Sequence, residues 1–452
     1  MERPYKPRIL VLITNPFAMI NVIHSGLIGE LGKRWHISIL SNLLTESDIV
    51  HFNHHFCLNM ELLKTPVPAL SWFEKRVRSS QVLLFGHFFN LATFRIKLFE
   101  RHRAVQWVFH TIRGSYLIRL FTGWLLLQTR GWLIRHTTRP DEYQALLRHN
   151  FRAVLSTSPL DLRENKIINS LKSCGIKCIS MLISWDNLTS KGIINTNFDM
   201  VLVWNELMAA EYNRFYQMFG DIGCVCVTGV PRFDIYFKKM PFNAILTRLS
   251  GIDPDKRVIL FATGAVKHHS CQNYIIDDLL EYGKEKRDIL ILVRCHPGDD
   301  PDRYRQYSCS KKLVFYQPFN MKSPVPPVDF LETLQLQLEA CYVCVQVAST
   351  MFLDAAACNK PVISIAYDAH PGTPYISSVR RFYDYSHHFP LHKLLEGHIA
   401  YNKAELFVKL DEALKCPHTT GNSWETAKPI IHHCAPDSTH LTTQYIQVCL
   451  DR

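Results

Sequence analysis

Short apolar runs alternate with amphipathic segments along the first half of the chain. Residues 8–13 form a continuous apolar run, which is typical of a strand buried on both faces of a sheet. A helical segment at 20–33 and a second strand at 36–40 follow, and this order predicts a parallel β-α-β unit. The alternation continues with predicted strands at 151–156, 177–183, 200–204 and 225–229, and with predicted helices at 160–174 and 206–219.

A second series of the same kind begins after residue 241. Its predicted strands are 257–262, 289–294, 342–347 and 361–365, and its predicted helices are 271–286 and 350–358. Two such series predict an α/β fold of two doubly wound, Rossmann-like domains that face each other across a cleft. We expect the domains to span 1–235 and 236–452, with the last helices crossing back to the first domain.

Composition agrees with a folded, non-fibrous protein. The chain has 452 residues, of which 47% are hydrophobic and 20% charged, and this excludes a disordered or collagen-like chain. The formal net charge is +11, and its distribution is uneven. Segment 71–135 holds eleven Lys and Arg against two acids, so it carries a surplus of nine positive charges.

Within this basic segment, apolar residues from Leu117 to Leu125 follow helical spacing, and arginines flank them. Trp72, Trp107 and Trp124 lie among the basic residues, a pattern that suits an anionic membrane surface. A domain-packing helix with a solvated basic face is an equal alternative. Because no nucleic-acid-binding signature is present, we expect no nucleic-acid partner.

Fourteen cysteines are present without the dense pattern of a disulfide framework. Five of them lie in apolar, strand-like runs, where we expect buried free thiols of a reducing compartment: Cys178, Cys224, Cys226, Cys341 and Cys344. The first residues do not predict a signal peptide, and no apolar run reaches the ~18 residues of a spanning helix. The expected location is the cytoplasm, with peripheral attachment to the inner face of the cell membrane.

Polar residues follow several predicted strands, at the sheet edge where such folds bind ligands. After strand 177–183 the sequence reads S-W-D-N-L-T-S-K-G. Asp186 has the chemistry of a general base, and Lys191 that of a phosphate partner. Asn187 and Thr189 are further candidates to bind a phosphate or another ligand group. The structural alternative is an Asx-type turn that caps a helix.

The next two loops carry fewer candidates. Arg232 follows strand 225–229 within T-G-V-P-R-F-D, where it could bind a phosphate or a carboxylate. A structural hinge between the domains is nearly as good an interpretation of this loop. Thr263 and Gly264 follow strand 257–262 in a loop of a size that suits a phosphate.

Two later loops suit a negatively charged leaving group. Arg294 and His296 close strand 289–294 as R-x-H-P, which places two cationic or donor groups at the strand end. Ser349 is a predicted N-cap of helix 350–358, whose unpaired N–H groups suit a pyrophosphate. Asp354, one turn into this helix, could fix the loop or contact a ligand hydroxyl.

In this order the loops resemble those of GT-B glycosyltransferases, and above all the CDP-glycerol glycerophosphotransferase-like (teichoic-acid polymerase) group and bacterial surface-polysaccharide transferases. The resemblance rests on W-D-N-L-T-S-K-G at 185–192, G-V-P-R-F-D at 229–234, F-A-T-G at 261–264, R-C-H-P at 294–297 and S-T-M-F-L-D at 349–354. It covers residues 150–370, whereas the first 45 residues match only as a generic β-α-β unit.

The resemblance implies an acceptor domain at 1–235 and a donor-nucleotide domain at 236–452. It implies that the donor phosphates and sugar or glycerol are bound by residues of the second domain, namely Thr263, Gly264, Arg294, His296, Ser349, Thr350 and Asp354. It also implies a base, which in teichoic-acid enzymes is a His that opens a His-Gly-x-Pro loop. This chain has Asp186 in that region instead, which favours a nucleotide sugar over a glycerophosphate donor.

The expected activity is that of an inverting, metal-independent glycosyltransferase of cell-envelope polysaccharide biosynthesis, with Asp186 and His296 as catalytic residues. The donor would be a UDP-, CDP- or GDP-linked sugar, and the acceptor a hydroxyl of a lipid-linked or surface glycan. No cofactor and no metal are expected. The alternatives are a CDP-glycerol or polyol-phosphate transferase, a nucleotide-sugar 2-epimerase, and a non-catalytic GT-B-like scaffold.

Overall fold

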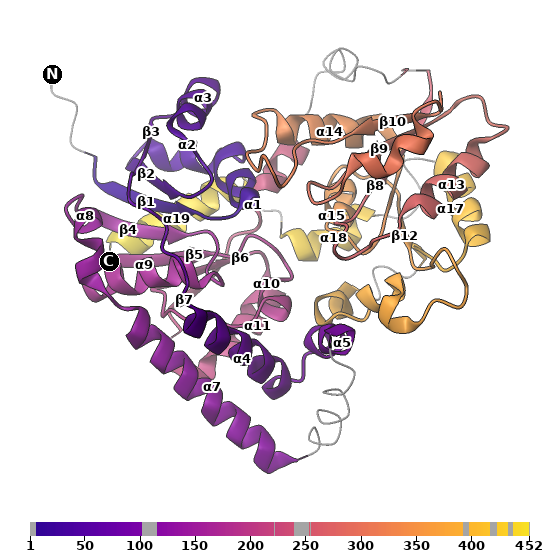
Figure 1. Cartoon of the computed structure of the whole chain (residues 1–452). Helices are drawn as coiled ribbons and strands as arrows, with labels where there is room; N and C mark the ends of the chain where they lie inside the picture. The colour runs from indigo at the N-terminus through magenta and orange to yellow at the C-terminus, as the bar shows by residue number, and fades with distance from the viewer. Residues whose placement is uncertain are drawn as a thin grey trace. The chain divides into compact units, whose positions relative to one another are not determined.

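The computed structural model describes residues 6–101, 115–220, 222–238, 253, 255–391, 397–415, 423–432 and 437–451. The chain divides into two compact units, the first formed by Met1–Arg232 with His432–Arg452 and the second by Phe233–Ile431. The C-terminal helix α19 (Ser438–Asp451), yellow in Figure 1, lies among the indigo and magenta elements of the first unit. The end of the chain therefore completes the unit with which the chain begins.

The first unit is built on a parallel sheet, which has seven strands among the described residues. In spatial order the strands are β3 (Met60–Leu62), β2 (His36–Ser41), β1 (Arg8–Ile13), β4 (Phe151–Ser156), β5 (Lys177–Met181), β6 (Met200–Val203) and β7 (Cys224–Val227). The interior strand β1 is buried from Ile9 to Ile13, as its continuous apolar run predicts.

Helices connect these strands, and several of them pack on the sheet, whereas α7 (Tyr116–Thr137) extends away from it (Figure 1). The others are α1 (Pro16–Met19), α2 (Leu27–Gly32), α3 (Glu46–Phe56), α4 (Trp72–Phe88), α5 (Ala92–Arg101), α8 (Gln144–Leu147), α9 (Leu162–Ser173), α10 (Asn187–Ser190) and α11 (Glu206–Tyr216). α9 shows how local sequence sets a boundary, because Asp161 caps its first turn by accepting a hydrogen bond from the Arg163 N–H.

The second unit repeats the plan with a parallel sheet, which has six strands in the described part of the chain. In spatial order they are β10 (Leu313–Tyr316), β9 (Ile289–Arg294), β8 (Arg257–Ala262), β11 (Cys341–Gln346), β12 (Val362–Ile365) and β13 (Ile399–Ala400). Its helices are α13 (Asn273–Gly283), α14 (Phe330–Ala340), α15 (Met351–Ala357), α17 (Lys403–Lys415) and α18 (Ser423–Ile431). The structure thus confirms two doubly wound, Rossmann-like α/β units.

The predicted helix at 20–33 is interrupted. The chain forms α1, then the π-helix η1 (Ile20–His24), and then α2. Gly26 separates the last two with a φ of +86°, a conformation that glycine adopts without steric cost. A hydrophobic period alone does not reveal this break, since the apolar positions continue through it.

The cysteines of the described residues are free thiols, as predicted, but they are not all buried. Cys178, Cys226, Cys341 and Cys344 are buried, whereas Cys224 is exposed. The reason is that Cys224 opens β7, which among the described strands has a neighbour on one side of the sheet only. The prediction of a buried Cys224 is therefore wrong.

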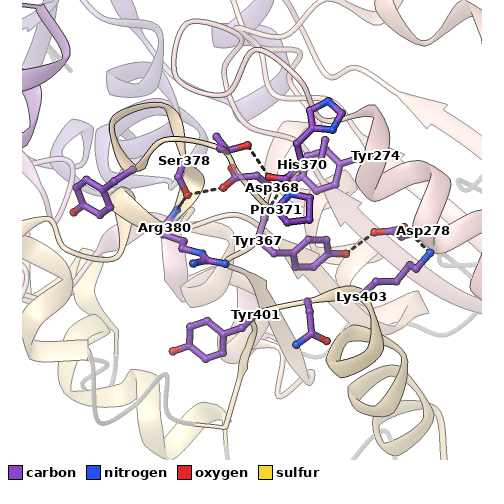
Figure 2. A pocket seen from close by; sticks show the side chains of 14 residues that line it. Tyr274, Asp278, Tyr367, Asp368, His370, Pro371, Ser378, Arg380, Tyr401 and Lys403 are labelled. Carbon is purple, nitrogen blue, oxygen red and sulfur yellow. Dashed lines mark hydrogen bonds and ion pairs between the residues drawn. The ribbon is translucent and has the colours of Figure 1, made fainter.

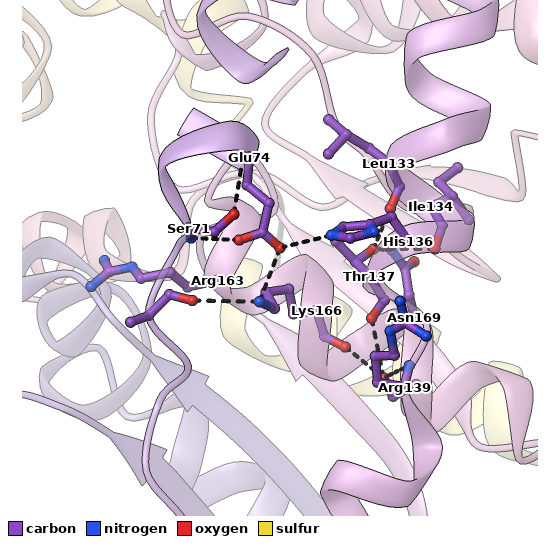
Figure 3. Close-up of polar contacts among 12 residues, drawn as sticks. Ser71, Glu74, Leu133, Ile134, His136, Thr137, Arg139, Arg163, Lys166 and Asn169 are labelled. Atoms are coloured by element: carbon purple, nitrogen blue, oxygen red, sulfur yellow. Dashed lines mark hydrogen bonds and ion pairs between the residues drawn. The ribbon is translucent and has the colours of Figure 1, made fainter. Parts of the chain in front are cut away.

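The basic segment forms the helices α4, α5 and α7, of which α4 and α7 pack against each other. A capping box between Ser71 and Glu74 starts α4 (Figure 3). The buried Glu74 carboxylate also lies 3.0 Å from the Lys166 ammonium on α9. Burial alone would raise the pKa of Glu74, but the hydrogen bonds from Ser71 and Lys166 outweigh it and hold the pKa below its usual value.

Arg130 departs from the expected solvated basic face of this segment. Its side chain is only 5% exposed, and its guanidinium donates hydrogen bonds to the carbonyls of Ile194 (2.9 Å) and Thr196 (2.8 Å). The positive charge at this position therefore anchors α7 to the first unit. Trp107, Arg103 and Arg113 lie outside the described residues. In the part of the chain that the structure describes, no helix is both long and apolar enough to cross a bilayer.

Candidate active site

Three loops of the second unit meet at one sheet edge. β8, β9 and β11 are parallel neighbours, so the loops that follow them leave the sheet from the same side. The chain runs from β8 outward through β9 to β10 and then resumes at β11 on the other side of β8. Such a reversal of strand order is where α/β sheets bind ligands, and the predicted donor-binding residues follow these three strands.

Hydrogen bonds join the loops after β8 and β9. The Thr263 hydroxyl accepts from the His296 backbone N–H (3.0 Å) and donates to the Asp299 carboxylate (2.5 Å). The same carboxylate oxygen accepts from the Tyr304 hydroxyl (2.7 Å), and Asp299 is buried. Asp299 therefore fixes the loop that carries His296. The local sequence does not predict this role, because nothing in it shows that the side chain of Asp299 points inward.

The imidazole of His296 has a defined tautomer. Its Nδ1 accepts a hydrogen bond from the Gly298 backbone N–H at 2.8 Å, so the ring proton resides on Nε2. Burial lowers the pKa of His296 to about 4, even though Asp299 acts in the opposite direction. At neutral pH the side chain is thus an uncharged group that offers an N–H donor.

Gly264 is already engaged in this structure. Its backbone N–H donates to the Gln272 side-chain oxygen (2.6 Å), and its carbonyl accepts from the Gln272 side-chain nitrogen (3.0 Å). The backbone donor that a phosphate-binding loop would offer is therefore held by Gln272. Sequence analysis did not predict this pair, since the two residues meet only when the loop folds back before α13.

Arg294 lies beneath the loop rather than at its surface. The side chain is 5% exposed, and its guanidinium donates to the Gln337 side-chain oxygen (2.5 Å). The rings of Tyr316 and Phe330 lie 5.2 and 5.3 Å from it. Burial lowers the pKa of Arg294. These contacts tie the end of β9 to α14, and they make Arg294 a support of the His296 loop.

The loop after β11 leads into a short helix. α15 begins at Met351 with Thr350 as its cap residue, so the predicted N-cap at Ser349 is wrong by one position. The Ser349 hydroxyl accepts from the Met351 N–H (3.3 Å), and both Ser349 and Thr350 are half-exposed. Asp354 is buried, and its carboxylate accepts from the Tyr236 hydroxyl (2.7 Å). Ser349 and Thr350 therefore lie nearer to solvent than Asp354.

In the first unit, the loop after β5 carries Asp186. The two carboxylate oxygens of Asp186 accept hydrogen bonds from the hydroxyls of Ser184 (2.5 Å) and Ser190 (2.6 Å). The Lys191 ammonium lies 4.0 Å from the carboxylate and donates to the Asn187 side chain (3.0 Å). These contacts bring the predicted Asp186, Asn187 and Lys191 together on a single turn of helix, α10.

The remaining first-unit candidates have different surroundings. Thr189 is buried, and its hydroxyl donates to the Asp186 carbonyl (3.4 Å). Arg232 is half-buried in the 3-10 segment Pro231–Phe237. The structure does not bring it onto the helical turn that carries Asp186.

Helix α4 of the basic segment packs against the loop that carries Asp186 and forms hydrogen bonds with it. From α4, Arg78 donates to the Lys191 carbonyl (3.0 Å), and Gln81 exchanges two hydrogen bonds with Asn195. Gly192 has a φ of +94°, and a Cβ added there would collide with Val82 of α4. Sequence analysis missed this contact, because α4 and the loop are about a hundred residues apart.

A buried acid occupies the reversal point of the first sheet. Glu164, in the first turn of α9, accepts from the hydroxyls of Thr14 (2.6 Å) and Ser156 (2.5 Å) and from the Ser158 N–H (3.0 Å). It is fully buried, and burial raises its pKa to about 7 despite these hydrogen bonds. Glu164 thereby joins the ends of β1 and β4.

Solved structures of low sequence identity share the fold of the chain. S. aureus MnaA in complex with UDP has 10% identity and a TM-score of 0.56 over 98% of this chain and 97% of that one. The Neisseria meningitidis UDP-GlcNAc 2-epimerase bound to UDP-GlcNAc has 10% identity and a TM-score of 0.54 over 98% and 100%. Arabidopsis thaliana UGT89C1 has 11% identity and a TM-score of 0.50 over 99% and 100%. These similarities show the GT-B fold.

At the level of sequence, no curated protein matches the chain. Residues 171–425 match the family described as CDP-Glycerol:Poly(glycerophosphate) glycerophosphotransferase. The matched range includes the loops of Asp186, His296 and Ser349, and it covers more than half of the chain. The chain therefore belongs to the CDP-glycerol:poly(glycerophosphate) glycerophosphotransferase family, a transferase group within the GT-B glycosyltransferase-like proteins.

Proposed function

We propose that the chain transfers a sugar from a nucleotide-activated donor to a hydroxyl acceptor, with the donor bound by the second unit. The observation that carries the proposal is the His296 loop, held by Thr263 and Asp299 at the strand reversal beside β8. Family membership supports a transferase, and two proteins of the same fold were solved with UDP or UDP-GlcNAc.

In this proposal His296 donates its Nε2–H to a phosphate oxygen of the donor. Because the ring is uncharged, it needs no counter-charge before the donor binds, and its hydrogen bond strengthens as the leaving group gains negative charge. Ser349 and Thr350 add hydroxyl donors from the neighbouring loop. We assign Arg294 and Asp354 positioning roles, since both side chains are buried against protein partners.

Asp186 is the proposed base, supplied by the first unit. Its carboxylate is held in place by the hydroxyls of Ser184 and Ser190, and in this proposal it accepts the proton of the acceptor hydroxyl. The acceptor O–H gives its proton to Asp186, and the acceptor oxygen forms a bond with the anomeric carbon. The bond from that carbon to the diphosphate breaks, and its electron pair leaves on the nucleotide diphosphate. A single displacement of this kind inverts the anomeric centre.

Transfer of a polyol phosphate from a CDP-polyol is the second candidate, because the family description favours it. In that reaction the acceptor oxygen attacks the β-phosphorus, and CMP leaves with the electron pair of the broken P–O bond. Asp186 takes the same proton in both reactions. The candidates differ in the nucleotide base and in the bond that is broken.

Calorimetry with UDP, GDP, CDP and CMP, followed by product analysis, tests the proposal. Wild-type protein is expected to bind one nucleotide, and His296→Ala to weaken that binding at least tenfold while the thermal unfolding midpoint stays the same. Glu332→Ala, a change on α14 that alters no residue of the three loops, is the control. Absence of nucleotide binding would leave only the scaffold alternative, and product formation without an acceptor would point to an epimerase.

We also propose that α7 attaches the protein to an anionic membrane. The outward side of its first half carries Leu117 (75% exposed), Leu120, Phe121 (58%) and Trp124 (53%), while Thr122 and Leu126 on the opposite side are buried. Four large apolar side chains on one exposed helix face are unfavourable in water, and Trp is suited to the headgroup region. The exposed Arg119 and Arg135 complement anionic lipid.

A further inference from the structure

A cavity of about 540 Å³ opens in the second unit between α13, the segment after β12 and the start of α17 (Figure 2). Several of its charged side chains are paired within the protein. Lys403 lies 3.0 Å from Glu281, and the Asp278 carboxylate accepts a hydrogen bond from the Tyr367 hydroxyl (2.7 Å). The cavity therefore identifies no ligand of its own. A pair of groups with more definite chemistry lies in the first unit.

Two cysteines on the strand β7 bring their thiols into contact. The Sγ atoms of Cys224 and Cys226 lie 3.6 Å apart. Only Val225 separates the two residues, so both side chains project from the same face of the strand. Cys224 is exposed, whereas Cys226 is only 5% exposed. One thiol of the pair is therefore accessible to reagents in solution, and the other is sheltered by the protein.

The backbone spacing of the pair is compatible with a disulfide. Along a parallel strand, residues two positions apart have Cα atoms separated by about 6.6 Å. A disulfide spans Cα separations of ~4.4–6.8 Å, so the pair lies near the upper end of this range. The thiols already face each other, and a small bend of β7 brings the Cα atoms to a more usual separation.

The position of β7 in the sheet permits such a bend. Among the described strands, β6 is its single neighbour. Two hydrogen bonds to the chain of β6 hold its ends, from the Cys224 N–H to the Asp199 carbonyl (3.0 Å) and from the Thr228 N–H to the Val203 carbonyl (2.9 Å). Bending between these two points opposes the hydrogen bonds, so a disulfide here is strained. Strained or exposed disulfides are readily reduced, unlike structural ones.

We propose that Cys224 and Cys226 form a reversible thiol–disulfide site, which a small-molecule disulfide such as oxidised glutathione oxidises. The Cys224 thiolate attacks one sulfur of oxidised glutathione, whose S–S bond breaks and releases one glutathione thiolate. The Cys226 thiolate then attacks the Cys224 sulfur of the mixed disulfide and releases the second glutathione. The two cysteines lose two electrons and two protons, which the two glutathione thiols gain. This site is independent of the proposed transferase function, because it uses none of the residues assigned to the donor or the acceptor.

Mass spectrometry of one tryptic peptide of the full chain tests the proposal. Cleavage after Arg214 and Arg232 yields peptide 215–232, which contains Cys224 and Cys226 and no other cysteine. The native protein is treated with oxidised glutathione, and the remaining thiols are then blocked with iodoacetamide. The peptide is expected to lose the mass of two hydrogen atoms and to carry no blocking group. Excess reduced glutathione is expected to restore both thiols.

Single substitutions separate the two steps. Cys226→Ser is expected to stop the reaction at the mixed disulfide, so that its peptide carries one glutathione on Cys224. Cys224→Ser is expected to leave Cys226 without glutathione, because Cys226 is buried. Cys309→Ser, which removes an exposed thiol of the second unit, is the control and should form the disulfide as wild type does.

Three results with the wild-type protein would overturn the proposal. They are a peptide that keeps both thiols, a peptide with glutathione on Cys224 and no internal disulfide, and a disulfide from either residue to a different cysteine. An internal disulfide that persists in excess reduced glutathione would contradict the reversibility of the site.

Discussion

The guanidinium of Arg78 on α4 donates a hydrogen bond to the backbone carbonyl of Lys191, at 3.0 Å. The same nitrogen also donates to the Leu160 carbonyl (3.0 Å), so one side chain ties the basic segment to the loop that carries Asp186. Because α4 packs against α7, the proposed membrane-binding helix and the proposed base belong to one continuous structure in the first unit.

Arg78→Met is expected to destabilise the protein by about 1–3 kcal/mol, since it removes a charged donor from two carbonyls. It should lower kcat/KM for transfer and leave nucleotide affinity unchanged, because the nucleotide loops belong to the second unit. Urea unfolding, turnover and calorimetry measure these effects. Lys75→Met, an exposed change on the same helix, is the control, and an equal effect in that variant would contradict the assignment.

Nucleotide affinity should be constant between pH 8 and pH 5.5 as far as His296 controls it. Burial lowers the pKa of His296 to about 4, so the ring stays uncharged throughout this range. The probe is a nucleotide sugar or CDP-glycerol, because its diphosphate does not titrate there. A rise in nucleotide affinity as the pH falls through ~6.5, the ordinary pKa of His, would contradict this prediction. It would show that the imidazole of His296 is protonated at a pH well above 4.

Glu164→Gln should become more stable relative to wild type as the pH rises from 4.5 to 7. The pKa of Glu164 is about 7 when folded, against a reference value of 4.5. Between these values the folded state holds the extra proton, so this carboxyl contributes stability at low pH that is lost as the pH rises. The change amounts to roughly 3 kcal/mol. Urea unfolding of both proteins at several pH values gives the difference, and parallel stability curves would refute it.

Ala348→Gly should stabilise the protein by about 0.5–1 kcal/mol. Ala348 has a φ of +41° in the loop between β11 and α15, where a side chain is strained and glycine is not. The greater freedom of glycine in the unfolded chain offsets part of the gain. Ala357→Gly, within α15, should change stability in the opposite direction by about 1 kcal/mol. Thermal unfolding of the two variants tests whether their stabilities change in opposite directions relative to wild type.

Vesicles that contain anionic lipid should carry the protein upward in a flotation gradient, and the double change Leu120→Ser and Trp124→Ser should abolish this. Both side chains are half-exposed on α7, so their loss removes apolar contact with lipid at little cost to folding. Val50→Ser, at an exposed apolar position of α3, serves as the control. Arg130 is unsuitable for such a test because it is buried. Equal flotation of all three proteins would leave α7 without a role at membranes.

Continuous apolar runs predicted the interior strands well. β1 and β9 have the predicted bounds, since strands covered on both faces carry the signal in their own residues. The edge strands β3, β10 and β13 were missed. They are short and largely half-buried, and pairing with a neighbour defines them more than their own sequence does.

The sequence located the candidate loops better than the directions of their side chains. Thr263 and His296 do meet, because both follow neighbouring parallel strands. Arg294 and Asp354 instead turn toward Gln337 and Tyr236, which are 43 and 118 residues away along the chain. Local sequence patterns cannot show such distant partners. A polar residue at a strand end therefore predicts where a site lies, but it does not predict whether that side chain binds the ligand or supports the loop.

Helix α19 has a consequence for biosynthesis. It packs on α2, and the Leu450 carbonyl accepts a hydrogen bond from Arg152 (2.9 Å), so residues that are synthesised after the whole second unit complete the first unit. The second unit is one uninterrupted stretch and can fold while translation continues. The first unit must wait with an incomplete core until α19 has been synthesised, and a truncation that removes α19 would damage the first unit more than the second.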